Sequence, residues 1–173
     1  MNIEIIENGI VCGWIALLVY GARRNSNLQS ILLVLLAPKV IDVFILTHIS
    51  NAIRHGEYRH FFFLMHSAND ALMIALLCAR PYIHIFTRWR CCFERLWSEW
   101  FIVAIYFASI IVNLLVFNEY LTKWAGEPTN LYFYNNYETI KRVLFYSEAL
   151  ILSWLTIQTL IAVRNLKRKG LIK

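Results

Sequence analysis

Five apolar stretches constrain the fold of this chain more than any other feature of its sequence. A helix rises about 1.5 Å per residue, so roughly 20 apolar residues cross the hydrocarbon layer of a bilayer. The stretches approach that length and lie at residues 8–22, 28–50, 61–80, 97–117 and 143–163. They lack the alternation that marks the strands of a membrane β-barrel. The sequence therefore predicts an all-α, polytopic transmembrane helical bundle with about five spans.

Composition favours a single membrane domain over residues 1–173. The chain is 59% hydrophobic and only 16% charged, whereas about a quarter of the residues in soluble domains are charged. The first stretch is the shortest, so a four-span alternative with residues 1–22 on the membrane surface stays open. Gly9 and Gly13 have the small-xxx-small spacing that lets a membrane helix pack closely on a neighbour.

Basic residues are distributed unevenly between the segments that join the spans, which predicts the orientation. With the N-terminus outside, eleven of the seventeen Lys and Arg residues fall on the cytoplasmic side, five fall outside and Lys39 lies within a span. Cytoplasmic segments of membrane proteins carry such an excess of positive charge. We therefore expect an integral membrane protein with its N-terminus outside and its C-terminus in the cytoplasm, and a bacterial inner membrane is favoured.

Residues 82–95 have the pattern of a short cytoplasmic amphipathic helix. Aromatic residues recur there at three- and four-residue steps, and arginines lie mostly on the other side. Such a helix binds the headgroup region of a bilayer with anionic lipids. A docking surface for a cytoplasmic protein is the alternative, and nucleic acid is disfavoured because lipid accounts for the pattern. The residues assigned to this lipid or partner surface are Arg88, Trp89, Arg90 and Arg95.

Residues 118–142 form the longest connection between predicted spans. Gly126 and Pro128 indicate a turn in its middle, and aromatic residues crowd both sides of that turn. We expect an outer loop whose aromatic rings form a belt at the membrane interface. A lid over the outer mouth of the bundle is the alternative.

Polar side chains inside the apolar stretches are the candidate functional residues. A charge at the centre of a bilayer costs about 2.5 to 3.5 kcal/mol even on lenient scales, so such groups face protein or water. Counting from the ends of each span places the acids of the second and third spans near the midplane. The predicted intramembrane cluster consists of Lys39, Asp42, His66, Asn69, Asp70, Asn113 and Glu148.

The charges in this cluster do not balance by sequence reasoning alone. Lys39 precedes Asp42 by three residues, which permits an ion pair on one helix face. His66 and Asp70 share a stripe on the third span. Since Lys39 neutralises only one midplane acid, we expect the other to be protonated, to pair with a protonated histidine or to hold a cation. The cluster is predicted to open outward through Glu148 and Asn113.

Four interpretations of the cluster stay open. It is a hydrogen-bonded core that joins helices or subunits, a proton or cation path, a small-ligand pocket, or a metal or haem site. The sequence contains no recognised metal-ligand spacing and no cysteine pair at ligand spacing. It also lacks a phosphate-binding glycine loop and a GxSxG elbow. We therefore expect no metal, no cofactor and no catalytic residue.

These features predict a small non-enzymatic membrane protein, an oligomeric sensing or permeation module with a polar outward-facing interior and a basic cytoplasmic face. A homo-oligomer is expected because five short helices enclose little interior. A proton- or cation-coupled channel or transporter that uses midplane carboxylates is one alternative. The other is a membrane component of a two-protein stress or antiphage defence system, or a phage-encoded membrane protein. No motif is specific enough to name a family.

Overall fold

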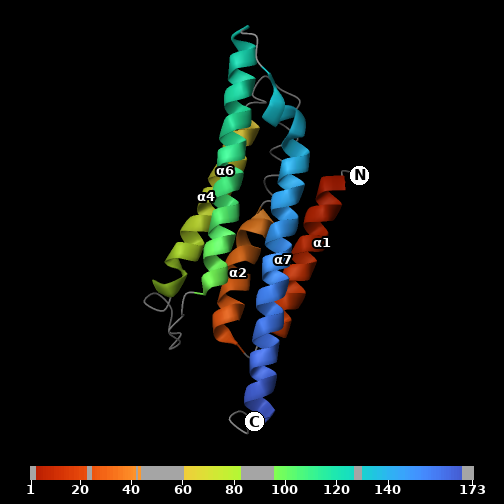
Figure 1. Ribbon diagram of the computed structural model, residues 1–173, viewed down its shortest axis with the longest axis vertical. Helices are drawn as coiled ribbons and strands as arrows, with labels where there is room; N and C mark the ends of the chain where they lie inside the picture. Colours follow the sequence, from red (N-terminus) through yellow and green to blue (C-terminus); the bar gives the residue numbers. More distant parts are fainter. Residues whose placement is uncertain are drawn as a thin grey trace.

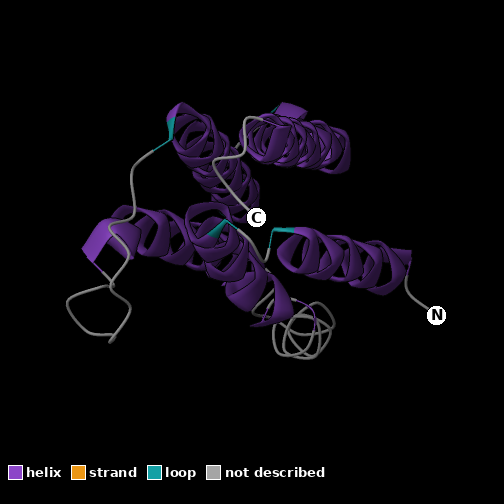
Figure 2. Ribbon diagram, turned by 90° about the horizontal axis from the view of Figure 1, so that it is seen from below, coloured by secondary structure: helices purple, strands orange, loops and turns teal. Residues whose placement is uncertain are grey.

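The fold is all-helical throughout the part of the chain that the computed structural model describes (Figures 1 and 2), which confirms the all-α part of the prediction. The described residues are 3–22, 25–41, 43, 61–82, 96–126 and 130–168. The α-helices within them are α1 (Ile3–Gly21), α2 (Ser26–Ile41), α4 (Phe61–Ala79), α6 (Trp97–Trp124) and α7 (Tyr132–Arg168). A short 3-10 helix, η2 (Arg80–Tyr82), extends α4.

The helices divide into a hairpin and a three-helix unit. Helices α1 and α2 pack on each other, whereas α6 packs between α4 and α7. Helix α2 contacts the three-helix unit mainly through α4 and only slightly through α7. All five run roughly along the long axis of Figure 1. We call the two ends of the bundle the Arg80 end and the Trp124 end, after residues at the ends of η2 and α6.

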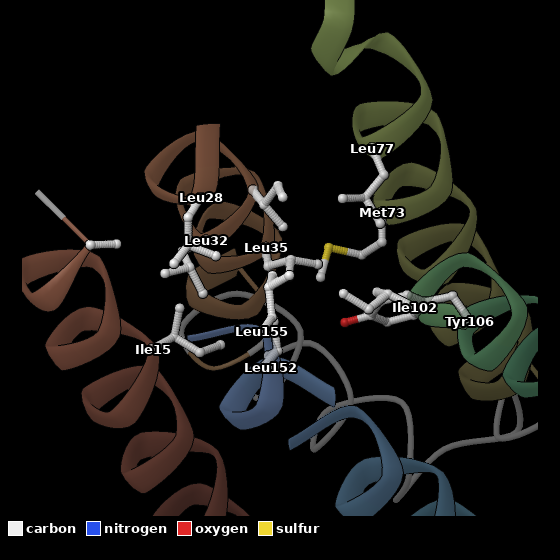
Figure 3. Close-up of a cluster of buried hydrophobic side chains, with 12 residues drawn as sticks. Ile15, Leu28, Leu32, Leu35, Met73, Leu77, Ile102, Tyr106, Leu152 and Leu155 are labelled. Atoms are coloured by element: carbon white, nitrogen blue, oxygen red, sulfur yellow. The ribbon is translucent and has the colours of Figure 1, made fainter. Parts of the chain in front are cut away.

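An apolar core joins the hairpin to the three-helix unit (Figure 3). Helix α2 buries four aliphatic side chains, and α4, α6 and α7 supply the surface opposite. The fully or almost fully buried members are Ile15, Ala22, Leu28, Ile31, Leu32, Leu35, Met73, Leu77, Ile102, Tyr106, Leu152 and Leu155. Gly9 and Gly13 lie outside this packing, because a Cβ at either would meet no described atom within 4 Å. The close approach that their spacing permits is therefore not made to any described helix.

Helix boundaries agree with the predicted spans best at α4 and at the start of α6. Helix α2 is described to Ile41, so the second half of the predicted 28–50 span lies outside the described residues. The predicted loop 118–142 is wrong, because α6 continues to Trp124 and α7 begins at Tyr132. A turn follows α6 at residues 125–126, and Gly126 adopts a φ of 80°, which favours glycine.

Two helical stretches are long and apolar enough to cross a membrane, Phe61–Tyr82 and Trp97–Trp124. Only 22% and 28% of their most apolar windows are buried, so neither resembles the enclosed core helix of a soluble protein. Residues 9–21 and helix α2 are apolar but shorter. The structure is thus compatible with a membrane helical protein, and five crossings stay a prediction.

Helix α6 buries its polar side and exposes its apolar side. The buried positions follow one another at steps of three and four residues: Glu99, Ile102, Tyr106, Ser109, Asn113 and Val116. Large apolar residues are exposed on the remaining surface: Trp97, Trp100, Phe101, Phe107, Ile111, Leu114 and Leu115. A helix at a water-exposed surface has the opposite arrangement. Helix α6 therefore suits lipid on the outside and polar contacts on the inside.

Helices α4 and α6 are antiparallel and packed in a regular register. Arg80 meets Glu99, and Asp70 meets Ser109, so the two contacts lie ten residues apart on each helix. The buried residues of α4 also follow steps of three and four: Phe63, Ser67, Asp70, Met73 and Leu77. This spacing is typical of helix pairs that interlock side chains along a seam. Polar and apolar layers alternate along the seam between α4 and α6.

The Glu119 carboxylate caps the start of α7 and fixes the turn at the Trp124 end. It accepts hydrogen bonds from the backbone N–H groups of Phe133 at 3.0 Å and Tyr134 at 2.8 Å. The first N–H groups of a helix have no partner within the helix, and a cap is worth about 1 kcal/mol. We expect Glu119→Ala to speed amide hydrogen exchange at both residues. Glu138→Ala, on an exposed part of α7, should leave that exchange unchanged, and equal exchange in the two variants would contradict the cap.

Candidate functional site

Three buried clusters, each built on one carboxylate and one cation from different helices, make up the polar interior of the described bundle. The ion pairs are Asp70 with Lys141, Glu148 with Lys39, and Glu99 with Arg80. All three carboxylates are at least nine-tenths buried as whole residues. Helix α6 contributes to every cluster from its buried polar side. The clusters therefore link α2, α4, α6 and α7.

The Asp70 cluster contains two hydrogen-bond chains that converge on one carboxylate oxygen. Lys141 Nζ donates to Ser109 Oγ at 2.5 Å, and the Ser109 hydroxyl donates to Asp70 Oδ2. In the second chain, Tyr137 donates to Asn113 Oδ1 at 2.8 Å, and Asn113 Nδ2 donates to Asp70 Oδ2 at 3.2 Å. Lys141 Nζ also lies 3.5 Å from Asp70 Oδ2. One cation and two neutral donors thus converge on Asp70 Oδ2.

The Glu148 cluster lies two helical turns further along α7 and joins it to α2. Lys39 Nζ is 3.1 Å from Glu148 Oε2, and the Tyr106 hydroxyl donates to Glu148 Oε1 at 2.5 Å. The Lys39 ammonium also lies 5.7 Å from the centre of the Tyr106 ring and 5.8 Å from that of Phe145. Aromatic faces attract cations at such distances. Lys39 follows Pro38, which lies inside α2 and cannot donate a backbone hydrogen bond.

The Arg80 cluster lies at the Arg80 end of the bundle. Arg80 is fully buried, and its Nε and Nη2 atoms donate to the two oxygens of Glu99. Its Nη1 atom donates to Asn27 Oδ1 at 2.6 Å and to Ser30 Oγ at 2.9 Å on α2. Glu99 also accepts the backbone N–H of Leu96 at the start of α6. The planar guanidinium therefore holds three helices together.

The structure corrects the predicted charge balance of the interior. Asp70 is paired with Lys141, a residue that sequence reasoning placed in the outer loop. Lys39 is paired with Glu148, and the predicted partner Asp42 lies outside the described residues. The expectation that Lys39 is the only cation for the midplane acids is wrong, because α7 begins earlier than predicted and brings Lys141 inside.

The remaining predicted residues have different outcomes. Asn113 is fully buried within the Asp70 cluster. His66 is half-buried with its ring edge-to-face against Phe62 at 4.4 Å between centroids, and Asn69 is half-buried on the same helix. The predicted amphipathic surface of Arg88, Trp89, Arg90 and Arg95 lies outside the described residues.

Sequence reasoning missed the polar residues on the buried side of α6 and the cations that meet them. Tyr106, Ser109 and Glu99 all fall within the predicted span 97–117. Their spacing of three and four residues, shared with Asn113, was the signal that could have found them. Arg80 was counted only as a cytoplasmic charge, and nothing local in the sequence indicates its burial.

Ser67 provides a prediction about the seam between α4 and α6. Its hydroxyl is buried and has no hydrogen-bond partner among the described residues. A buried polar atom without a partner costs about 1 to 3 kcal/mol. We expect Ser67→Ala to leave the free energy of unfolding unchanged or raise it by about 1 kcal/mol, whereas Ser109→Ala should lower it. Equal losses in detergent unfolding of both variants would contradict the difference between the two serines.

Comparisons with known proteins give no family. No family model matches the sequence, and no curated protein or solved structure is significantly similar to it. Among the described residues, no three His, Cys, Asp or Glu side chains gather as they do around a metal ion.

Proposed function

We propose that this chain is a small non-enzymatic membrane protein with five crossings whose polar interior binds and passes protons. The single observation that carries the proposal is the convergence of two hydrogen-bond chains on Asp70, beside a second lysine–carboxylate pair on the same face of α7. Ionisable groups inside membrane spans often mark proton relays. Purely structural contacts are more cheaply made by apolar packing, because replacing a buried ion pair with apolar residues is often neutral or stabilising.

Surface properties of α6 support the placement in a membrane. Trp97 and Trp124 are 84% and 80% exposed at the two ends of the helix. With 28 residues, α6 is roughly 40 Å long, which matches a bilayer including its interfacial regions. Tryptophan is enriched at both membrane interfaces. The positive-inside pattern then assigns the Arg80 end to the cytoplasm and the Trp124 end to the outside.

The charge states of the two lysine pairs suit proton exchange. Within each pair a proton can pass from the lysine ammonium to the carboxylate, which leaves both groups neutral, and the hydroxyl and amide neighbours can reorient around the neutral acid. Tyr106 and Ser109 lie one turn apart on α6, so each contacts a different carboxylate from the same helix face. The two lysines are only partly exposed, with 17% for Lys39 and 26% for Lys141. These features favour a hydrogen-bonded proton path over an open pore for larger ions.

Proton flux into liposomes tests the proposal. The native protein is reconstituted into vesicles that contain a pH-sensitive dye, and a potassium diffusion potential drives proton entry. We expect the native chain to acidify the interior faster than empty vesicles do, and Asp70→Asn and Glu148→Gln to remove most of that flux. Glu138→Gln, outside the clusters, should retain it. Flux equal to that of empty vesicles, or native rates in both cluster variants, would refute a proton path.

A further inference from the structure

The polar links between the α1–α2 hairpin and the three-helix unit differ in kind at two positions along the bundle. At the Arg80 end, Asn27 and Ser30 of α2 accept hydrogen bonds from Arg80. Further along α2, Lys39 forms an ion pair with Glu148 of α7. We call the first the neutral clasp, because both of its α2 groups are uncharged, and the second the charged clasp.

The neutral clasp can open without separating charges. Arg80 donates through Nε and Nη2 to Glu99, which belongs to the three-helix unit, and through Nη1 to the side chains of Asn27 and Ser30 and, at 3.5 Å, to the Asn27 carbonyl of α2. If α2 moves away, the guanidinium keeps its carboxylate. Each hydrogen bond from the charged guanidinium to a neutral acceptor contributes about 1.5 to 3 kcal/mol net. Opening the charged clasp instead separates the opposite charges of Lys39 and Glu148 within the bundle.

Apolar packing between the hairpin and the three-helix unit does not oppose this movement strongly in a membrane. Leu28, Leu32 and Leu35 of α2 are buried against the neighbouring helices. In lipid there is little hydrophobic drive to keep such surfaces together, since acyl chains are as apolar as leucine. The link between α2 and α7 is also slight apart from the charged clasp.

We propose that the α1–α2 hairpin is a gate, which pivots at the charged clasp Lys39–Glu148 and opens the bundle at the Arg80 end by releasing Asn27 and Ser30 from Arg80. The proposal rests on the proposed proton path, because the gate gives that path its access to the cytoplasmic side. In the structure both clasps are closed. The gate is therefore shut at the Arg80 end in this conformation.

Distances between spin labels test the movement without any measurement of flux. The four native cysteines are first removed. Spin labels are then attached to new cysteines at position 17 of α1 and position 100 of α6, in place of Leu17 and Trp100. A reference variant carries the labels at positions 100 and 154, in place of Trp100 and Trp154 of α7. All three positions are at least half exposed. The full chain in lipid nanodiscs is measured with an intact neutral clasp, with Asn27→Ala and Ser30→Ala combined, and with Gln29→Ala as the matched control on α2.

Loss of the two side-chain hydrogen bonds from Arg80 should raise the ratio of open to closed molecules at least tenfold. We expect a longer Leu17–Trp100 distance to gain population in the clasp variant only, while the Trp100–Trp154 distance stays unchanged. An unchanged Leu17–Trp100 distance would overturn the gate, and so would equal broadening of both distances, which indicates general loosening. Because this readout is structural, a moving hairpin without proton flux would reject the proton path alone, and flux with a rigid hairpin would reject the gate alone.

Discussion

Replacing Arg80 by alanine is expected to lower the free energy of unfolding by about 3 to 5 kcal/mol, the largest loss from any single change in the described bundle. The substitution leaves Glu99 buried without its cation and removes the guanidinium that donates to Asn27 and Ser30. Unfolding in detergent micelles, followed by the helical circular dichroism signal, measures the loss. Arg142→Ala, at an exposed position of α7, should change it by less than about 0.5 kcal/mol.

A double substitution separates the loss of the pair from the loss of one charge. Arg80→Leu combined with Glu99→Leu removes both charges, and replacing a complete buried pair with apolar residues is often neutral or stabilising. We expect the double variant to recover most of the stability that Arg80→Ala loses. A double variant as unstable as the single one would show that the cluster stabilises the bundle through its shape and not through charge pairing.

Lys141→Met should produce the second-largest loss, about 2 to 3 kcal/mol. The substitution keeps the length of the side chain but leaves Asp70 with only its neutral donors, Ser109 and Asn113. The expected loss is smaller than at Arg80, because the Lys141 side chain is 26% exposed and solvent weakens the pair. The same micelle unfolding measurement applies.

Neutralising the carboxylate as well should reverse much of that loss. Asp70→Asn in the Lys141→Met background removes the unpaired charge, so the double variant should be more stable than Lys141→Met alone. If the loss in the double variant equals the sum of the losses in Lys141→Met and Asp70→Asn, the ion pair is contradicted, because substitutions of residues that interact directly are not additive.

The helices were more predictable from the sequence than the contacts between them. Apolar length alone located α4 and the start of α6, because a membrane-length apolar run has few other folded forms. The start of α7 was missed, since Tyr132–Arg142 is polar enough to be read as a loop. That error hid Lys141 from the predicted interior.

Two acids of the candidate site were predicted from the sequence, but the ion pairs that they form were not. Asp70, Glu148 and Asn113 were identified because polar residues in apolar runs are rare. Their partners come from other helices, and pairing between helices depends on the register of packed seams, which a single sequence does not contain. Once the contacts of Asp70 with Ser109 and Arg80 with Glu99 set that register, the spacing of polar residues along α6 explains the arrangement.

Membrane topology is the claim on which the whole account depends, and labelling with a membrane-impermeant maleimide tests it most directly. In a variant without native cysteines, single cysteines replace Asn25 and Gly126, which lie in connections at opposite ends of the bundle, and a third is added at the N-terminus. In intact cells, we predict labelling at the N-terminus and at position 126, and labelling at position 25 only after the membrane is opened. Labelling of positions 25 and 126 from the same side would contradict a bundle that spans the membrane, and a protected N-terminus would contradict five crossings.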